Sequence, residues 1–354
     1  MRIGIPSETK PLEGRVALVP YACGDLVRAG HEVAIQSGAG DKSGFSDADF
    51  SKVGVKVVPD AAALFDFAEL VVKVKEPIAG DLSHLKSHHL LFCYLHLAAE
   101  PALTRSLQDI GLTGVAFETV EEAGGQLPLL APMSIIAGRI AVQVGTHLLH
   151  QPQGGRGVLL GGLGGAERGH IVVLGAGAAG GHAASLAAAG GARVTVFDKR
   201  TDRLEAMMAQ ADNISALYPY SEAVAEAVSE ADLVIGAVLV TGARAPHVVT
   251  REMVSQMLPG SIMIDISVDQ GGCFETTKPT TYENPTYVVD GVTHFAVTNM
   301  PGAVPRTSSQ ALSAAILPYV MKMASPNWRD DPALVRGVNV DNGAVVHPAL
   351  KELA

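Results

Sequence analysis

The sequence predicts an α/β protein with two Rossmann-like, doubly wound domains, each built on a largely parallel sheet. Short runs rich in Val, Ile and Leu alternate with segments of helical periodicity over residues 1–120, and the alternation starts again near residue 171. Strands and helices in steady alternation are typical of parallel sheets with helices on their faces. The chain has 354 residues, which is long enough for two such domains.

The first array contains six predicted strands and four predicted helices. Its β-branched runs lie at 2–5, 31–36, 55–58, 70–75, 89–95 and 112–117. The segments at 20–28, 47–52, 60–67 and 101–109 have the spacing of polar and apolar residues expected for helices packed on a sheet. A long helical pattern at 132–150 then follows as a candidate connection between domains.

A glycine-rich segment at 154–165 separates the two arrays. Such a segment is compatible with a phosphate-binding loop, but it lacks the Lys-Ser/Thr ending of a P-loop. Glycine clusters more often form turns or a hairpin, and we predict turns here.

The second array contains seven predicted strands. They lie at 171–174, 193–197, 214–217, 233–236, 262–266, 287–289 and 295–298. A helix is predicted from N-cap candidates at 307–309 to about residue 323, and Asn342-Gly343 in the tail indicates a hairpin. Because the tail has no sheet of its own, we expect residues 1–130 and 307–354 to form a substrate domain. The nucleotide-binding domain, residues 131–306, would be inserted into it.

Composition and charge exclude several classes of protein. Lys and Arg number 26 against 36 Asp and Glu, and the formal net charge is −10. The basic face that a nucleic-acid binder needs is therefore not expected. The N-terminus has no long apolar run of a signal peptide, and the apolar stretches break into strand-like and helix-like pieces. We expect a cytoplasmic enzyme with a small-molecule substrate and without nucleic-acid or membrane partners.

Neither a disulfide framework nor a metal site is expected. The three cysteines are an odd number and form no CxxC pair. His84, His88 and His89 lie close together in the sequence, but without carboxylates or cysteines at ligand spacing.

The strongest local motif is a dinucleotide-binding fingerprint. The apolar run 171–174 leads into Gly175-Ala176-Gly177-Ala178-Ala179-Gly180, and a helical segment and a second strand follow. The glycines allow a tight turn and a close approach to a pyrophosphate, whose charge the helix N-terminus stabilises. An unoccupied Rossmann-like turn is the alternative interpretation.

Asp198, at the end of that second strand, favours NAD over NADP. A carboxylate accepts hydrogen bonds from a ribose 2′-hydroxyl but repels a 2′-phosphate. Lys199, Arg200 and Arg203 are basic neighbours that could tolerate a phosphate, although Lys199 and Arg200 also fit a solvent-exposed loop and first helical turn.

Polar residues beyond the carboxyl ends of the predicted strands are candidates for the chemistry. Asp269 follows the strand at 262–266, and Asn299 follows the strand at 295–298. As an isolated aspartate, Asp269 could equally cap a turn.

Three basic side chains of the first array are further candidates. Lys75 ends the predicted strand 70–75, and His96 follows the apolar run that ends at residue 95. A surface lysine and a structural histidine are the alternative interpretations. Arg15 lies in a polar loop, and its planar guanidinium suits a carboxylate.

Several blocks of the sequence, in the same order and over nearly the whole chain, resemble those of the alanine dehydrogenase family. This family belongs to a superfamily that also contains the NAD-binding subunit of proton-translocating transhydrogenase. The blocks are Gly4-Ile5-Pro6-Ser7-Glu8, Arg15-Val16-Ala17, Lys73-Val74-Lys75-Glu76-Pro77, Leu95-His96-Leu97-Ala98, Leu129-Leu130-Ala131-Pro132-Met133-Ser134, residues 265–275 and Asn299-Met300-Pro301.

The resemblance implies roles for individual residues. Arg15 and Lys75 would bind the carboxylate and carbonyl of pyruvate, and Asn299 would line the pocket. Lys75, His96 and Asp269 would be the catalytic residues, with proton transfer assigned to His96 and Asp269. The nucleotide would be contacted by Ser134, Gly175, Ala176, Gly177, Ala178, Ala179, Gly180, Asp198, Arg203, Val238, Leu239, Ile266, Asp269 and Met300.

The implied activity is the reversible, NAD-dependent oxidative deamination of L-alanine to pyruvate and ammonia by a homo-hexamer. A dehydrogenase of another small amino acid, such as glycine, is one alternative. A non-catalytic transhydrogenase-type subunit is another, and the pair Lys75 and His96 argues against it. An inactive NAD sensor is disfavoured because candidates for the acid, the base and the carboxylate clamp are all present.

Overall fold

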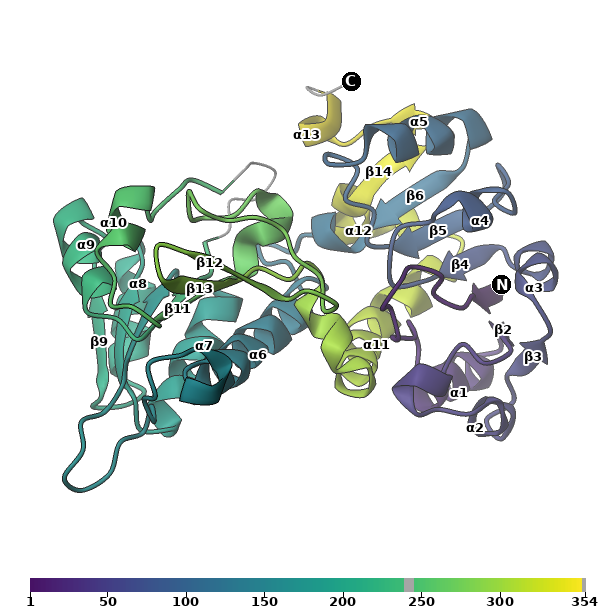
Figure 1. Cartoon of the computed structure of the whole chain (residues 1–354). Coiled ribbons are helices and arrows are strands. Elements are labelled where there is room, and N and C mark those ends of the chain that lie inside the picture. Colours follow the sequence, from purple (N-terminus) through teal and green to yellow (C-terminus); the bar gives the residue numbers. More distant parts are fainter. Residues whose placement is uncertain (239–244, 352–354) are drawn as a thin grey trace. The chain divides into compact units, whose positions relative to one another are not determined.

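The computed structural model describes residues 1–238 and 245–351. The chain divides into two compact units, one formed by Met1–Met133 with Gly302–Ala354 and the other by Ser134–Pro301. In the first unit, segments from both ends of the chain therefore fold together (Figure 1).

The first unit is built on an eight-stranded sheet of order β15-β14-β6-β5-β4-β1-β2-β3. Its strands are β1 (Arg2–Ile5), β2 (Glu32–Gln36), β3 (Lys56–Val58), β4 (Leu70–Val72), β5 (Leu90–Cys93), β6 (Thr113–Ala116), β14 (Val338–Asp341) and β15 (Ala344–Val345). Strands β1 to β6 are parallel and follow the doubly wound order 3-2-1-4-5-6. The topological switch point, where such folds bind ligands, therefore lies between β1 and β4.

The helices of this unit are α1 (Pro20–Arg28), α2 (Asp47–Ser51), α3 (Ala61–Phe67), α4 (Ala79–Leu82), α5 (Pro101–Ile110), α11 (Pro305–Met323), α12 (Pro332–Gly337) and α13 (Pro348–Lys351), with short 3-10 turns η1 (Asp41–Ser43), η2 (Phe117–Thr119) and η6 (Trp328–Asp330). Helices α1 to α5 lie between successive strands, whereas α11 and α12 precede β14 and α13 follows β15. Helix α11 begins at Pro305 and not at the predicted caps 307–309, because the fixed φ of proline suits a first helical turn. Its serines turn inward instead: Ser309 Oγ and Ser313 Oγ accept hydrogen bonds from backbone N–H groups of the loop at 16–19.

The tail adds two antiparallel strands to the first sheet. Strand β14 pairs with β6, and β15 pairs with β14 across a tight turn at Asn342-Gly343 (Figure 1). Both turn residues have positive φ, 48° and 78°, as the predicted Asn-Gly hairpin requires.

The second unit is built on a seven-stranded sheet of order β12-β13-β11-β10-β7-β8-β9. Its strands are β7 (His170–Leu174), β8 (Arg193–Phe197), β9 (Ile214–Leu217), β10 (Leu233–Gly236), β11 (Ile262–Asp265), β12 (Thr286–Val289) and β13 (Val292–Phe295). All are parallel except β12, and the parallel strands again follow the order 3-2-1-4-5-6. The switch point of this sheet lies between β7 and β10.

Both faces of the second sheet are buried. Along β7, Ile171 and Val173 belong to one apolar core, whereas Val172 and Leu174 belong to the core of the opposite face. The elements packed around the sheet are α6 (Ala131–Leu148), α7 (Ala178–Ala189), α8 (Thr201–Met208), α9 (Ser221–Ser229) and α10 (Arg251–Ser255), with 3-10 turns η3 (Gln151–Gln153), η4 (Ile266–Gln270) and η5 (Met300–Ala303). The predicted fold class, two doubly wound α/β sheets, is confirmed.

Several predicted strand limits are wrong. The predicted strand 70–75 ends at Val72, and the predicted strand 295–298 is displaced, because β13 spans Val292–Phe295. The pattern of the sequence is misleading there, since apolar residues continue past each strand into buried loops: Val74 and Val297 are almost completely buried. The predicted strand 262–266 ends at Asp265, and Ile266 already belongs to η4.

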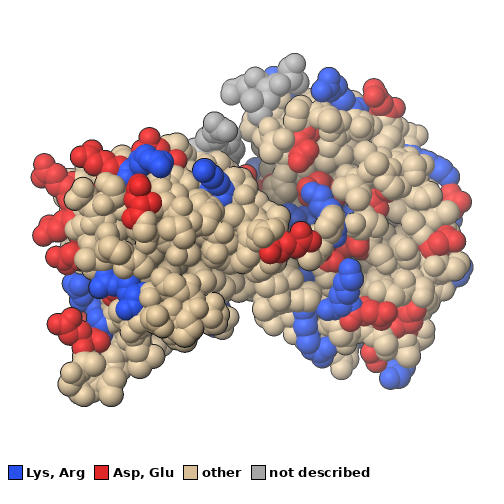
Figure 2. All heavy atoms as spheres, in the orientation of Figure 1, with Lys and Arg blue, Asp and Glu red and all other residues tan. Residues whose placement is uncertain are grey.

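The glycine-rich segment at 154–165 consists of turns, with a single bridge between Leu163 and Ala166. The strand β7 follows it, whereas a phosphate-binding loop needs a helix N-terminus at that point. Within the described parts of the chain, none of the helices combines the length and apolarity needed to cross a bilayer. On the face drawn in Figure 2, basic and acidic side chains are interspersed.

Candidate functional site

The glycine turn between β7 and α7 is shaped by steric crowding. Gly175 has φ 100°, a conformation that residues with a Cβ rarely adopt. A Cβ added to Gly180 would lie 1.7 Å from the carbonyl oxygen of Gly175, so only glycine fits there. A Cβ added to Gly177 would meet nothing closer than an Arg203 nitrogen at 3.6 Å. The fold therefore requires glycine at 175 and 180, whereas at 177, the N-cap of α7, a Cβ would fit with an ordinary van der Waals contact.

Asp198 lies beyond β8 and contacts the glycine turn directly. Its Oδ2 accepts a hydrogen bond from the Ala176 N–H at 2.7 Å, and its Oδ1 accepts one from the Arg200 N–H at 2.8 Å. The guanidinium of Arg203 lies 3.5 Å from Oδ2. A carboxylate offers about four acceptor positions, so these contacts leave capacity for a ribose hydroxyl. Three predicted cofactor-binding residues thus lie together.

The other predicted nucleotide contacts are distributed around the same sheet edge. Ser134 lies on α6 one turn before Gly138, whose Cβ position would be 2.1 Å from the Ala179 carbonyl oxygen, so α6 and α7 cross closely there. Val238 follows β10, and its carbonyl oxygen accepts a hydrogen bond from Ser267 Oγ at 2.8 Å. Leu239, also predicted, lies outside the described residues.

Asp265 at the end of β11 organises the loop that carries Asp269. Its buried carboxylate accepts hydrogen bonds from the N–H groups of Ser267 and Cys273, both at 2.9 Å, and from the Thr277 hydroxyl. Burial raises the pKa of Asp265. Asp269 is exposed on η4, and Ile266 at the start of that turn packs partly against the core.

Asn299 and Met300 follow β13 in the same unit. Asn299 has φ 63°, in the left-handed region that asparagine tolerates better than most residues. The Met300 side chain is buried in the core, and its carbonyl oxygen accepts a hydrogen bond from the Tyr282 hydroxyl at 2.8 Å.

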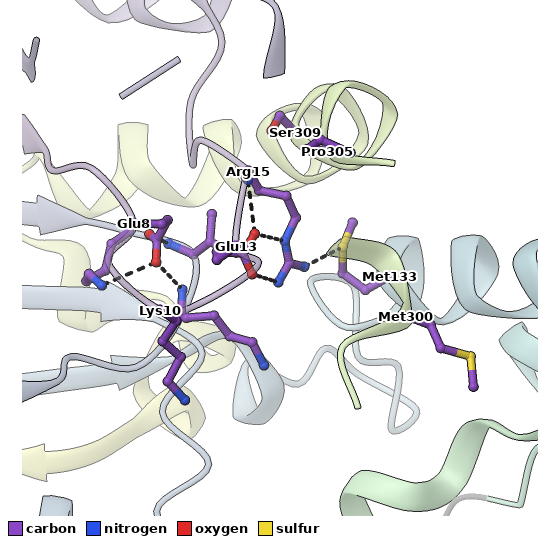
Figure 3. A network of polar contacts seen from close by, with 12 residues as sticks. Glu8, Lys10, Glu13, Arg15, Met133, Met300, Pro305 and Ser309 are labelled. Atoms are coloured by element: carbon purple, nitrogen blue, oxygen red, sulfur yellow. Dashed lines mark hydrogen bonds and ion pairs between the residues drawn. The ribbon is translucent and has the colours of Figure 1, made fainter. Parts of the chain in front are cut away.

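In the first unit, Arg15 lies in the loop after β1, next to the switch point. Its Nε and Nη2 donate to the Glu13 carboxylate at 2.7 and 2.6 Å, and its Nη1 lies 3.2 Å from Met133 Sδ (Figure 3). Only 2% of the Arg15 side chain is exposed. This two-point contact fixes the plane of the guanidinium, which is the geometry used in carboxylate recognition.

The structure separates the roles of the two lysines that follow β4. Lys73 is buried and forms ion pairs with Glu8 and Asp81 at 3.3 and 3.2 Å. Lys75 is only partly buried and lies in the loop beyond the strand, not at the predicted strand end. Lys75 is therefore the better candidate to meet a ligand, although the predicted strand that led to it is wrong.

His96 lies beyond β5 with φ 50°, a strained conformation for a residue with a side chain. Its backbone N–H donates to Glu118 Oε1 at 2.6 Å, and its ring stacks on the Tyr94 ring with a centroid separation of 5.7 Å. By contrast, His89 is structural: the Lys86 N–H donates to its Nδ1, and its Nε2 lies 2.9 Å from the Phe65 carbonyl oxygen.

Sequence reasoning missed the acidic residues that hold the Arg15 side chain and the backbone of the loops that carry the other candidates. Glu8 and Glu13 follow β1, Glu118 follows β6, and Asp265 ends β11. The rule that selected Asp269, a polar residue beyond the carboxyl end of a strand, would also have found Glu8 and Glu118.

Comparisons with known proteins agree with this architecture. Family models for the N-terminal and C-terminal domains of alanine dehydrogenase/PNT match residues 4–137 and 141–348. The chain belongs to the alanine dehydrogenase/PNT family.

Members of this family resemble the chain over its whole length. Alanine dehydrogenase of Halomonas elongata is 49% identical over 99% of this chain and 96% of that protein. Alanine dehydrogenase of Mycobacterium tuberculosis is 48% identical over 98% of this chain and 95% of that protein. A solved L-alanine dehydrogenase superposes with a TM-score of 0.95 at 48% identity, covering 100% of both chains.

A transhydrogenase from Sinorhizobium meliloti is a more distant match. It superposes with a TM-score of 0.85 at 26% identity and covers 99% of this chain and 100% of that one.

Proposed function

We propose that this protein is an L-alanine dehydrogenase that couples the reversible oxidative deamination of L-alanine to pyruvate and ammonia with reduction of NAD⁺. The observation that carries the proposal is full-length similarity to proteins named alanine dehydrogenase, at 44–49% identity. The candidates Lys75, His96, Asp198, Asp269 and Asn299 support it, because each follows the carboxyl end of a parallel strand.

The second unit fits an NAD-type dinucleotide. The absence of a side chain at Gly177, the N-cap of α7, lets a pyrophosphate approach the helix N-terminus, where the helix dipole favours negative charge. The Asp198 carboxylate suits a ribose diol and disfavours a 2′-phosphate, so NAD is preferred over NADP. Bound there, the nicotinamide would accept the hydride from the amino acid.

The residues of the first unit bind and orient the substrate. Arg15, fixed by Glu13, binds the substrate carboxylate, and Lys75 donates to the carbonyl oxygen of pyruvate. His96 acts as the proton acceptor and donor when water adds to the imine carbon and ammonia leaves.

In the second unit, Asp269 is the other proton-transfer group and Asn299 contributes to the substrate pocket. The exposed position of Asp269 on η4, in a loop held by Asp265, supports this role.

The test is NADH formation from NAD⁺ by the purified protein over a panel of L-amino acids, with pyruvate, ammonia and NADH as the reverse assay. We expect oxidation of L-alanine and slower or absent oxidation of glycine and larger amino acids. If no amino acid supports NADH formation although NADH binds, the transhydrogenase-type subunit becomes the better interpretation. A homo-hexameric assembly remains a prediction from the family resemblance, and a cytoplasmic location remains a prediction from the N-terminal sequence and the pattern of apolar residues.

A further inference from the structure

A buried ion cluster of Glu8, Lys73 and Asp81 takes no part in the chemistry proposed above. Lys73 Nζ lies 3.3 Å from Glu8 Oε2 and 3.2 Å from Asp81 Oδ2, and no more than 4% of any of these side chains is exposed. Burial opposes the charge of Lys73, but the two carboxylates outweigh it and hold the pKa of Lys73 above its usual value. Because buried ion pairs are weak contributors to net stability, this cluster calls for another explanation.

Glu8 holds backbone as well as Lys73. Its Oε1 accepts a hydrogen bond from the Val74 N–H at 2.6 Å, and its Oε2 accepts one from the Lys75 N–H at 3.2 Å. Both N–H groups lie beyond Val72, where β4 ends. On the side of β5, backbone bonds continue for two residues: the Lys73 N–H donates to the Phe92 carbonyl oxygen, and the Val74 carbonyl oxygen accepts from the Tyr94 N–H. The Glu8 carboxylate adds the acceptors for the N–H groups of Val74 and Lys75.

We propose that Glu8 is a positioning residue that fixes the backbone from which the Lys75 side chain extends toward substrate. This inference rests on the proposed function of Lys75. Lys73 anchors Glu8, since it pairs with the same Oε2 that receives the Lys75 N–H. At the other end of the loop, Asp81 Oδ2 accepts a hydrogen bond from the Ile78 N–H at 3.1 Å. The segment that carries Lys75 is thus tied at both ends.

The same arrangement recurs on the neighbouring strand. Glu118 accepts hydrogen bonds from the N–H groups of Leu95 at 3.2 Å and His96 at 2.6 Å, again just beyond the end of a parallel strand. Two adjacent strands thus end in a candidate functional residue whose backbone N–H is held by a carboxylate from elsewhere in the chain. The recurrence supports a positioning role for Glu8 over a purely local packing role.

Two variants separate positioning from ion pairing. Glu8→Gln removes one carboxylate from Lys73 and one of the two acceptor oxygens that hold residues 74 and 75. Asp81→Asn also removes a carboxylate from Lys73. Its amide oxygen can still accept the Ile78 N–H, and both backbone hydrogen bonds to Glu8 stay in place. We expect Glu8→Gln to lower kcat/KM for pyruvate by about 10²-fold, as misplacement of a reacting group by about an ångström does. Asp81→Asn should cost at least about tenfold less, and NADH affinity should be unchanged in both variants.

A second measurement does not depend on turnover. The rate at which a small acylating reagent labels Lys75, measured by mass spectrometry against the exposed Lys86, should change several-fold in Glu8→Gln and not in Asp81→Asn. If Glu8→Gln does not fold, Glu8→Asp, which keeps the charge but shortens the reach, takes its place with the same expectation.

The proposal is wrong if labelling of Lys75 is unchanged in the Glu8 variant, or if both variants lose activity equally. If the wild-type protein oxidises no amino acid, the proposed function fails, and labelling alone then decides whether Glu8 positions Lys75.

Discussion

The N–H of Ala176 donates a hydrogen bond to Asp198 across 2.7 Å, and this bond joins the glycine turn to the acidic residue that follows the next strand. Asp198 thereby has two tasks in the proposed nucleotide site. It supports the turn that would receive the pyrophosphate, and it presents a carboxylate to the ribose. A substitution at Asp198 consequently affects both parts of the site.

Replacing Asp198 should narrow the preference for NAD over NADP. Asp198→Ser removes the charge that repels a 2′-phosphate and leaves Arg200 and Arg203 nearby. Because a hydrogen bond to a charged group contributes ~1.5–3 kcal/mol, NAD affinity should fall by about 10- to 100-fold, with NADP affected less. Titrations with both reduced cofactors measure this. Glu205→Gln removes an exposed carboxylate of the following helix α8 and should leave the ratio unchanged. Equal use of both cofactors by the wild type would contradict the assignment.

Alanine substitutions in the glycine turn should show which glycines are required for folding stability and which are required for nucleotide binding. Gly180→Ala places a Cβ against the Gly175 carbonyl and should destabilise the second unit by about 1–3 kcal/mol or more. Gly177→Ala makes only an ordinary van der Waals contact, with an Arg203 nitrogen at 3.6 Å, and should keep the melting temperature while weakening NADH binding. Thermal unfolding and calorimetric titration of both variants test this. Normal NADH affinity in Gly177→Ala would show that the pyrophosphate does not approach there.

The sequence predicted architecture better than it predicted loops. Strand and helix alternation identified both sheets because their cores are made of nearly continuous apolar runs, as in β7 and β10. Loop positions were less predictable because Val74 and Val297 are apolar and buried without belonging to strands. Hydrogen bonds that fix the candidate residues, such as the one from the His96 N–H to the Glu118 carboxylate, join residues distant in sequence. No local sequence pattern encodes such bonds.

Loss of Lys75 or His96 should abolish most turnover without affecting nucleotide binding. Both residues lie in the first unit, whereas the glycine turn belongs to the second. Removal of a positioned acid or base costs about 10²–10⁴-fold in rate, so Lys75→Ala and His96→Ala should each lose at least about 10²-fold in kcat. Steady-state assays and calorimetry with NADH separate the two effects. Alanine substitutions of the exposed residues His88 and Lys86 are the controls and should keep normal activity. If the alanine variant of Lys75 or of His96 kept more than about a tenth of normal activity, the catalytic role of that residue would be refuted.

Asp269→Ala should reduce both turnover and NADH affinity, because Asp269 lies in the nucleotide unit on the turn that follows β11. Asp269→Asn keeps the shape of the side chain but not its ability to carry a proton at neutral pH. We therefore expect Asp269→Asn to lose about 10²-fold or more in kcat while keeping most of its NADH affinity. Equal kcat for Asp269→Asn and the wild type would exclude proton transfer at this position.

Buried histidines should make the second unit sensitive to mild acid. Burial lowers the pKa of His170 and His294 below the usual 6.5, and each ring contacts a threonine hydroxyl, Thr195 at 2.9 Å and Thr276 at 2.8 Å. Below about pH 6.5 the histidines of the unfolded chain bind protons, whereas the same rings in the folded protein resist protonation. The stability that these groups contribute above pH 6.5 is therefore lost as the pH falls towards the lower pKa values of the folded state.

Thermal unfolding at pH 8 and pH 5.5 should therefore show a lower melting temperature in acid. Ordinary carboxylates, with pKa values near ~4, remain ionised over this interval. His294→Gln should reduce the acid-induced decrease, whereas His247→Gln, at an exposed position of the second unit, should leave it unchanged. An identical decrease in all three proteins would assign the acid sensitivity to other groups.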